Sequence, residues 1–179
     1  MRRLPLLAFA FLAGLAALSG CRGYRAGSLM HPDIRSVSIG DVKNQTPHPG
    51  LSTQVRNELA RELARSAAAT LVRPAAADAV LHVTITESST EAIANTQVRE
   101  PVDGEESADV RQPVLYRTRV TLHGRLKLPR DGTPVVERSA KGYAEFDRTP
   151  EVPEARRAAS EQAIRNAVQH LVSTITQAW

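Results

Sequence analysis

The strongest constraint on the fold is a strict alternation of side chains between Val114 and Leu128. Every second position holds an apolar, small or uncharged residue, and most of the intervening positions are basic. Successive side chains of a β-strand point to opposite faces, so this period of two predicts one long strand with an apolar face and a basic face. Asp131-Gly132 is a strong hairpin signal. The chain should therefore return from Val135 to Phe146 as an antiparallel partner strand.

Four other segments carry a recognisable period. Alternating residues predict strands at 34–39 and 78–86, and apolar residues at helical spacing predict helices from Leu51 and from Glu154 to Trp179. Turn-forming residues at 43–50 separate the first strand from the first helix. A structureless loop over 87–113 would be unusually long. We therefore expect its ends to extend the flanking strands and only its acidic middle, around 103–109, to be mobile.

The predicted order of elements is strand, helix, three strands and helix. Each helix has one apolar stripe and the sheet has one apolar face, so the simplest burial places both helices on that face. The sequence thus predicts an α+β domain over residues 33–179. We expect a four-stranded, mostly antiparallel sheet with two helices packed on one face and the other face uncovered.

The N-terminus has the three-part layout of a bacterial export signal, with a basic start, an apolar run over 4–18 and small residues at 19 and 20. The run is shorter than the roughly 20 apolar residues of a membrane-spanning helix. Leu18-Ser19-Gly20-Cys21 is similar to the lipobox, in which the cysteine is acylated and becomes the new N-terminus. We expect residues 1–20 to be removed, Cys21 to carry a covalent lipid and residues 21–32 to form a tether.

Charge and motifs narrow the function classes. Removal of the signal takes two arginines from 23 basic residues, which leaves them nearly balanced by 19 acidic residues. No run of five basic residues is present, so we expect no nucleic-acid partner. The sequence lacks the motifs of common hydrolases, metalloenzymes and phosphate-binding loops, so we expect no enzymatic activity and no cofactor beyond the lipid on Cys21. A metal site joining His82 and His123 to Glu137 or Glu145 is a remote alternative to ordinary surface histidines.

The basic face of the strand over 114–128 is the candidate binding site. Its members stand roughly 6.5 to 7 Å apart along the strand, and they are Arg117, Arg119, His123, Arg125 and Lys127. Such a row suits the phosphates or carboxylates of a lipid headgroup or polysaccharide. Equally open is a solvated sheet face whose charges are balanced by Glu137 and Glu145 across the hairpin.

Several short motifs carry a family resemblance when taken together. They are Gly23-Tyr24 behind the cysteine, Asn44-Gln45-Thr46, Pro49-Gly50-Leu51, Ala77-Asp78-Ala79-Val80-Leu81, Tyr116-Arg117 and the terminal Trp179. In this order they resemble the LptE family, formerly called rare lipoprotein B, the outer-membrane lipoproteins of the lipopolysaccharide-assembly translocon. The chain departs from the family pattern in the inserted Arg22 and in Val42-Lys43, where an aromatic residue commonly precedes the asparagine.

The resemblance implies a helix-over-sheet domain inside the lumen of a large LptD-like β-barrel in the outer membrane. The domain would plug the barrel, support its assembly and contact lipopolysaccharide on its way to the outer leaflet, with the basic row facing the barrel wall or the glycolipid. It would face the periplasm or the barrel lumen, anchored to the membrane through its lipid. Two alternatives stay open: another periplasmic lipoprotein of secretion or transport assemblies, and an envelope enzyme with an unrecognised site.

Overall fold

The computed structural model describes residues 34–66, 69–102, 105–129, 132–148 and 152–177. The predicted signal, Cys21, the tether and Trp179 lie outside these residues. No helix in the described ranges is long and apolar enough to cross a membrane. The elements are β1 (Ser36–Asn44), α2 (Leu51–Ser66), β2 (Thr70–Leu71), the 3₁₀ helix η2 (Pro74–Ala76), β3 (Ala79–Val102), β4 (Glu105–Lys127), β5 (Pro134–Asp147) and α3 (Val152–Thr176).

The strands form one mixed sheet in the order β2-β1-β3-β4-β5. β1 pairs in parallel with β2 and β3, whereas β3, β4 and β5 pair antiparallel. The α+β class is confirmed, but the prediction of four mostly antiparallel strands is wrong in detail. After β1 the chain returns through α2 to the end of the sheet where β1 began. β3 therefore starts at that end and runs parallel to β1. β2 has only two residues, too few for a period to be visible in the sequence.

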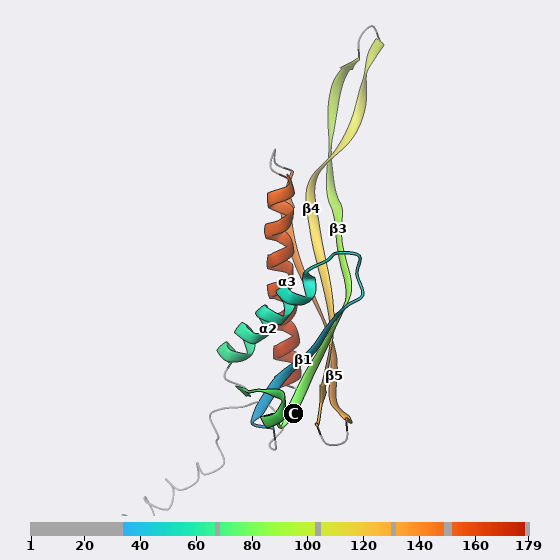
Figure 1. The fold of residues 1–179 in the computed structure, drawn as a ribbon. Coiled ribbons are helices and arrows are strands. Elements are labelled where there is room, and N and C mark those ends of the chain that lie inside the picture. Colours follow the sequence, from blue (N-terminus) through green and yellow to red (C-terminus); the bar gives the residue numbers. More distant parts are fainter. Residues whose placement is uncertain (1–33, 67–68, 103–104, 130–131, 149–151, 178–179) are drawn as a thin grey trace, which may run out of the picture.

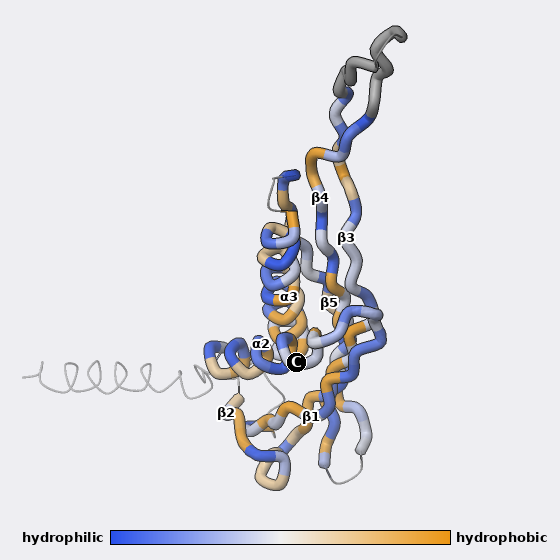
Figure 2. Tube along the Cα trace, turned by 45° about the horizontal axis from the view of Figure 1, so that its top comes forward, coloured by the Kyte–Doolittle hydropathy of each residue, from blue (hydrophilic) through white to orange (hydrophobic). Residues whose placement is uncertain are grey.

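Both helices lie on one side of the sheet, as predicted (Figure 1). The alternation along β4 is also confirmed, because Val120, Leu122 and Leu126 are fully buried while the basic residues between them are not. The core joins these residues to the apolar stripes of α2 and α3. Figure 2 shows hydrophobic and hydrophilic residues alternating along the strands beside the helices. The sheet therefore has one covered face and one face without a layer over it.

β3 and β4 form a long hairpin that extends beyond the helices (Figure 1). The expectation that the strands extend into 87–113 is confirmed, and the extension goes further than predicted. Glu105, Glu106 and Asp109 lie in β4 rather than in a loop, and Asp103 lies outside the described residues. The last residue pair of β4 and β5 is Leu115 with Asp147. Beyond that pair the hairpin continues as a two-stranded arm.

The Asn-x-Thr motif has a structural role at the end of β1. The side-chain oxygen of Asn44 accepts hydrogen bonds from the backbone N–H and the hydroxyl of Thr46, at 2.9 and 2.8 Å. Its amide donates to the carbonyl of His48 at 2.7 Å. Gly50 follows with a φ of 83°, a left-handed conformation that favours glycine, and α2 begins at the next residue. These contacts turn the chain from the sheet into the helix layer.

Asp78 ties the start of β3 to the start of β1. Its Oδ2 accepts hydrogen bonds from the backbone N–H of Arg35 at 3.1 Å and of Ser36 at 2.9 Å, and from the Ser36 hydroxyl at 2.7 Å. The hydroxyl bond, followed by the two backbone bonds, lowers the pKa of Asp78 below its usual value because all three favour the ionised carboxylate. The ionised form of Asp78 therefore stabilises this parallel pairing.

We predict that Asp78→Asn reduces the free energy of unfolding at pH 7. A carboxyl with a lowered folded-state pKa stabilises the fold above its unfolded pKa of about 4, and this contribution is lost as the pH falls through the folded-state pKa. Urea unfolding at pH 7 and between pH 5 and 2 should show a weaker acid dependence in the variant than in the wild type. Asp147→Asn, which changes an exposed carboxyl at the end of β5, serves as the control. An unchanged acid dependence in Asp78→Asn would contradict the assignment.

α3 lies against β5 at a distance that leaves no room for a side chain at Gly142. A Cβ atom there would overlap the carbonyl oxygen of Ala163 and the amide nitrogen of Ala167, both in the backbone of α3. At Gly124 of β4 the nearest atoms belong instead to the side chain of Leu171, 3.0 Å from the position of a Cβ. Backbone cannot rotate away as a side chain can. Gly142 therefore fixes how closely α3 approaches the sheet.

We predict that Gly142→Ala destabilises the domain by about 1–3 kcal/mol, the usual cost of overpacking a core. Gly124→Ala is the matched control, since it adds the same methyl group beneath the same helix but meets a movable side chain, and its cost should be smaller. Chemical denaturation of the full chain measures both. Equal or reversed costs would show that the approach of α3 does not depend on Gly142.

Candidate binding face of the sheet

The side of β3, β4 and β5 opposite the helices is here called the outward face. Residue register and alternating burial assign its members. They are His82, Thr84, Glu87, Ser89 and Glu91 of β3, Arg117, Arg119, Thr121, His123, Arg125 and Lys127 of β4, and Glu137, Ser139, Lys141, Tyr143 and Glu145 of β5. All five basic residues of the predicted site thus lie on one face, between carboxylates contributed by the two neighbouring strands.

One part of this face, the basic end, comprises His123, Arg125, Lys127 and Glu137. A single carboxylate oxygen of Glu137 contacts Nε of Arg125 and Nε2 of His123, each at 3.0 Å. Lys127 has no partner among the described residues. Two permanently basic side chains, Arg125 and Lys127, therefore stand beside one carboxylate, which leaves a surplus of positive charge.

The other part, the tyrosine end, comprises Glu87, Glu91, Arg117, Arg119, Lys141, Tyr143 and Glu145. Arg117 donates from Nε and Nη2 to one oxygen of Glu145, at 2.9 and 2.6 Å. Arg119 pairs with Glu91 at 2.9 Å and Glu87 at 3.3 Å. Lys141 lies in the same row as Glu87, since both are opposite Thr121 in the register. Three basic side chains thus meet three carboxylates, so the charge here is balanced, unlike that of the basic end.

Hydrogen bonding holds the carboxylate of Glu87 in its ionised form. The Thr121 hydroxyl donates to Glu87 at 2.9 Å. This bond is the largest cause of a lowered pKa at Glu87, and the guanidinium of Arg119 adds to it. Conversely, the carboxylates of Glu91 and Glu87 raise the pKa of Arg119. Each group therefore stabilises the charged form of its neighbour.

A β-bulge brings the β3 carboxylates onto this face. The register of β3 against β4 shifts between Ile85 and Glu87. Ile85 is buried beneath the helices, yet Glu87, two residues later, lies outward beside Arg119. One extra residue in a strand reverses the phase of every later side chain. Strict alternation in the sequence could not reveal this bulge. Pairing of the basic row with Glu137 and Glu145, by contrast, is one of the two interpretations that the sequence allows for that row.

The two histidines considered from the sequence as possible metal ligands, His82 and His123, lie on neighbouring strands. His82 is opposite Arg125 in the register, and His123 is opposite Thr84 and paired with Glu137. Within the described ranges, no group of three histidine, cysteine, aspartate or glutamate side chains is placed to hold a metal ion. His123 instead contacts the carboxylate of Glu137.

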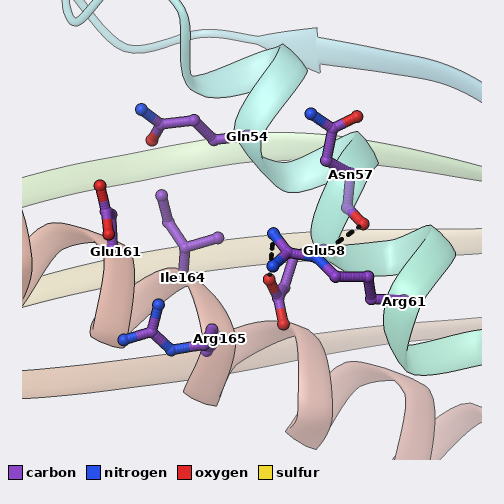
Figure 3. A pocket seen from close by; sticks show the side chains of 7 residues that line it. All are labelled: Gln54, Asn57, Glu58, Arg61, Glu161, Ile164 and Arg165. Atoms are coloured by element: carbon purple, nitrogen blue, oxygen red, sulfur yellow. Dashed lines mark hydrogen bonds and ion pairs between the residues drawn. The ribbon is translucent and has the colours of Figure 1, made fainter. Parts of the chain in front are cut away.

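A cleft lies between the two helices, on the other side of the molecule (Figure 3). This cleft of about 240 Å³ is lined by Gln54, Asn57, Glu58, Arg61, Glu161, Ile164 and Arg165. Its buried carboxylate, Glu58, is already paired with Arg61 at 2.8 Å. Arg165 is bound to Gln162 on its own helix. Glu58, Arg61 and Arg165 therefore already have partners within the helix layer, whereas Lys127 and Lys141 of the outward face have none among the described residues, so the outward face is the stronger candidate.

Comparison with solved structures shows that other bacterial proteins share this fold. A protein from Xanthomonas campestris superposes with a TM-score of 0.53 at 15% identity, covering 86% of this chain and 92% of that one. A minor lipoprotein from Acinetobacter baumannii gives 0.50 at 10% identity, covering 80% and 93%. A hypothetical protein from Chlamydia trachomatis gives 0.51 at 13%, covering 79% and 93%. At these identities the likeness concerns the fold alone.

The sequence comparison is more specific. No curated protein matches the chain. A family profile described as "LptE: Lipopolysaccharide-assembly" matches residues 34–178, which include every described residue. The resemblance of the short motifs is thereby confirmed. The chain belongs to the LptE family of lipopolysaccharide-assembly lipoproteins.

Proposed function

We propose that this chain is a non-enzymatic component of the outer-membrane lipopolysaccharide translocon. It occupies the lumen of a large LptD-like β-barrel, supports the assembly of that barrel and contacts lipopolysaccharide during insertion into the outer leaflet. The observation that carries the proposal, beyond family membership, is the outward face. It is a broad sheet surface of charged and hydrogen-bonding side chains on a domain whose apolar residues are buried beneath two helices.

The outward face suits a polar wall. The interior of a large outer-membrane barrel is polar, so a domain inside it needs a surface whose polar groups stay satisfied when water is displaced. The ion pairs of Arg117, Arg119 and Arg125 with their carboxylates supply such partners within the chain itself, although the buried Nε of Arg119 has none among the described residues. The same face would be a poor match for an apolar partner, because its charges would be desolvated without new partners.

The basic end suits the anionic groups of the glycolipid. Arg125 and Lys127 together exceed the charge of Glu137, the one carboxylate of the basic end. Guanidinium groups bind phosphate through paired hydrogen bonds, and lysine adds a mobile positive charge. We therefore place phosphate contact at the basic end rather than along the whole predicted row. Arg117 and Arg119 stay candidates for contact with the barrel or the glycolipid through polar groups other than phosphate.

The membrane anchor is part of the same proposal. A single acyl chain binds a bilayer reversibly, and two or more chains anchor a protein stably. Multiple acylation at Cys21 would hold the domain at the outer membrane, where the partner barrel resides.

We expect the double substitution Arg125→Glu and Lys127→Glu to weaken lipopolysaccharide binding by at least about tenfold at low salt, with a smaller difference near 1 M salt, where charges are screened beyond roughly 3 Å. Binding of the glycolipid to the detergent-solubilised full chain measures this. Arg156→Glu with Arg157→Glu, the same charge change on an exposed part of α3, is the matched control. Unchanged binding at low salt, or an equal loss in the control, would remove the basic end from the proposal.

Co-purification tests the partner. The tagged lipoprotein, extracted from outer membranes in detergent, should recover a very large β-barrel protein in a one-to-one ratio. Recovery with inner-membrane transporter subunits, or with no partner, would favour the alternative of a different periplasmic assembly lipoprotein.

A further inference from the structure

Tyr143 stands out at the tyrosine end because its ring is surrounded by charged groups yet remains accessible. It is 42% exposed, and Leu71 is the one other large hydrophobic residue of the described ranges that is comparably exposed. Tyr143 lies directly opposite Arg119 in the register of β4 and β5. An aromatic ring at such a position offers a flat apolar surface with polar groups on its rim.

The neighbouring guanidinium groups flank this ring. The central carbon of Arg119 is 5.6 Å from the ring centre and that of Arg117 is 6.0 Å away. Both distances are near the outer limit of about 6 Å for attraction between a cation and a ring. The groups are close enough to orient the ring, while its exposure shows that they leave part of it accessible.

The arginines are themselves held in place. Arg117 is fixed by two hydrogen bonds to Glu145, and Arg119 lies between Glu87 and Glu91. The side chains of Arg117, Glu145 and Glu91 are 38%, 45% and 50% exposed. They therefore keep hydrogen-bonding capacity toward solvent beside the ring. Fixed donors and acceptors around an apolar surface lower the ordering cost of binding a ligand.

The charge balance decides which ligand fits. Phosphate would have to displace or approach three carboxylates that already balance Arg117, Arg119 and Lys141, so the tyrosine end offers an anion no surplus of positive charge. A neutral sugar has hydroxyl groups that donate to carboxylates and accept from guanidinium groups. The C–H groups on one side of its ring carry a small positive charge and pack against the negative face of an aromatic ring.

We propose that the tyrosine end is a binding site for a neutral sugar ring of the glycolipid's saccharide, stacked on Tyr143. This inference rests on the proposed function, because it takes the saccharide from the glycolipid assigned there. Arg119 and Arg125 are six residues apart on β4, a separation of about 20 Å at the usual rise of a strand. The sugar site and the phosphate-binding basic end would thus contact different parts of one large molecule.

The test uses lipopolysaccharide stripped of its acyl chains and phosphate groups as the probe. Calorimetric titration of the detergent-solubilised full chain should detect binding that changes little between low and high salt. Tyr143→Ala and Tyr143→Leu should weaken it about tenfold, the order expected for losing one aromatic contact, and Tyr143→Phe should retain it. Arg138→Ala, at an exposed position of β5 outside the outward face, is the matched control. Tyr143→Leu guards against a folding defect because an aliphatic residue fits the strand without offering a ring.

The outcomes separate the inference from the proposed function. The inference is overturned if the wild-type chain does not bind the stripped saccharide, or if Tyr143→Ala and Tyr143→Leu bind it as well as Tyr143→Phe does. In that event intact lipopolysaccharide can still bind in a salt-dependent way at the basic end, so the proposed function survives. If the Tyr143 variants instead lose the co-purified barrel and keep saccharide binding, Tyr143 belongs to a protein interface and the sugar site is also overturned.

Discussion

The close contact of α3 with β5 at Gly142 determines which face of the sheet is available to partners. The helix backbone occupies the space that a side chain would need, and Ala163 and Ala167 continue the contact with small groups. α3 can therefore lie along β5 and β4 while α2 covers β1 on the same side (Figure 1). Because both helices occupy one face, the side chains of alternate residues on the other face project from the sheet without a covering layer.

The outward face is organised by pairing across strands rather than by a single row of charge. β4 provides the cations, and β3 and β5 provide the carboxylates that bind them. Exposed pairs of this kind contribute little to stability, typically about 0–1 kcal/mol each. Their main effect is to fix where charge is balanced and where it is in excess. The two ends of the face consequently differ in the ligands they favour, anionic groups beside Lys127 and neutral hydroxyl groups beside Tyr143.

Much of this architecture could be predicted from the sequence because burial imposes regular patterns on it. The alternation around Val120 and Leu122 identified both the core face and the basic face of β4. Two features left no such pattern. β2 is too short for any period, and the bulge before Glu87 reverses the phase of β3, so the carboxylates of Glu87 and Glu91 could not be assigned to the face of Arg119. Tyr143 could have been assigned to the outward face from the sequence, since it lies two residues before Glu145 on a predicted strand and therefore points to the same side.

If the uncovered face of the sheet meets the barrel and the glycolipid, residues on that face should lie within reach of both in the cell. Photo-crosslinking in intact cells measures this, with a photoreactive residue placed at Ser139 on the outward face or at Arg157 on the exposed side of α3, both of which are exposed. We expect strong crosslinks to the barrel protein or to lipopolysaccharide from position 139 and much weaker ones from position 157. Crosslinks from position 157 with none from position 139 would contradict this expectation, because the helix layer would then be the contact surface.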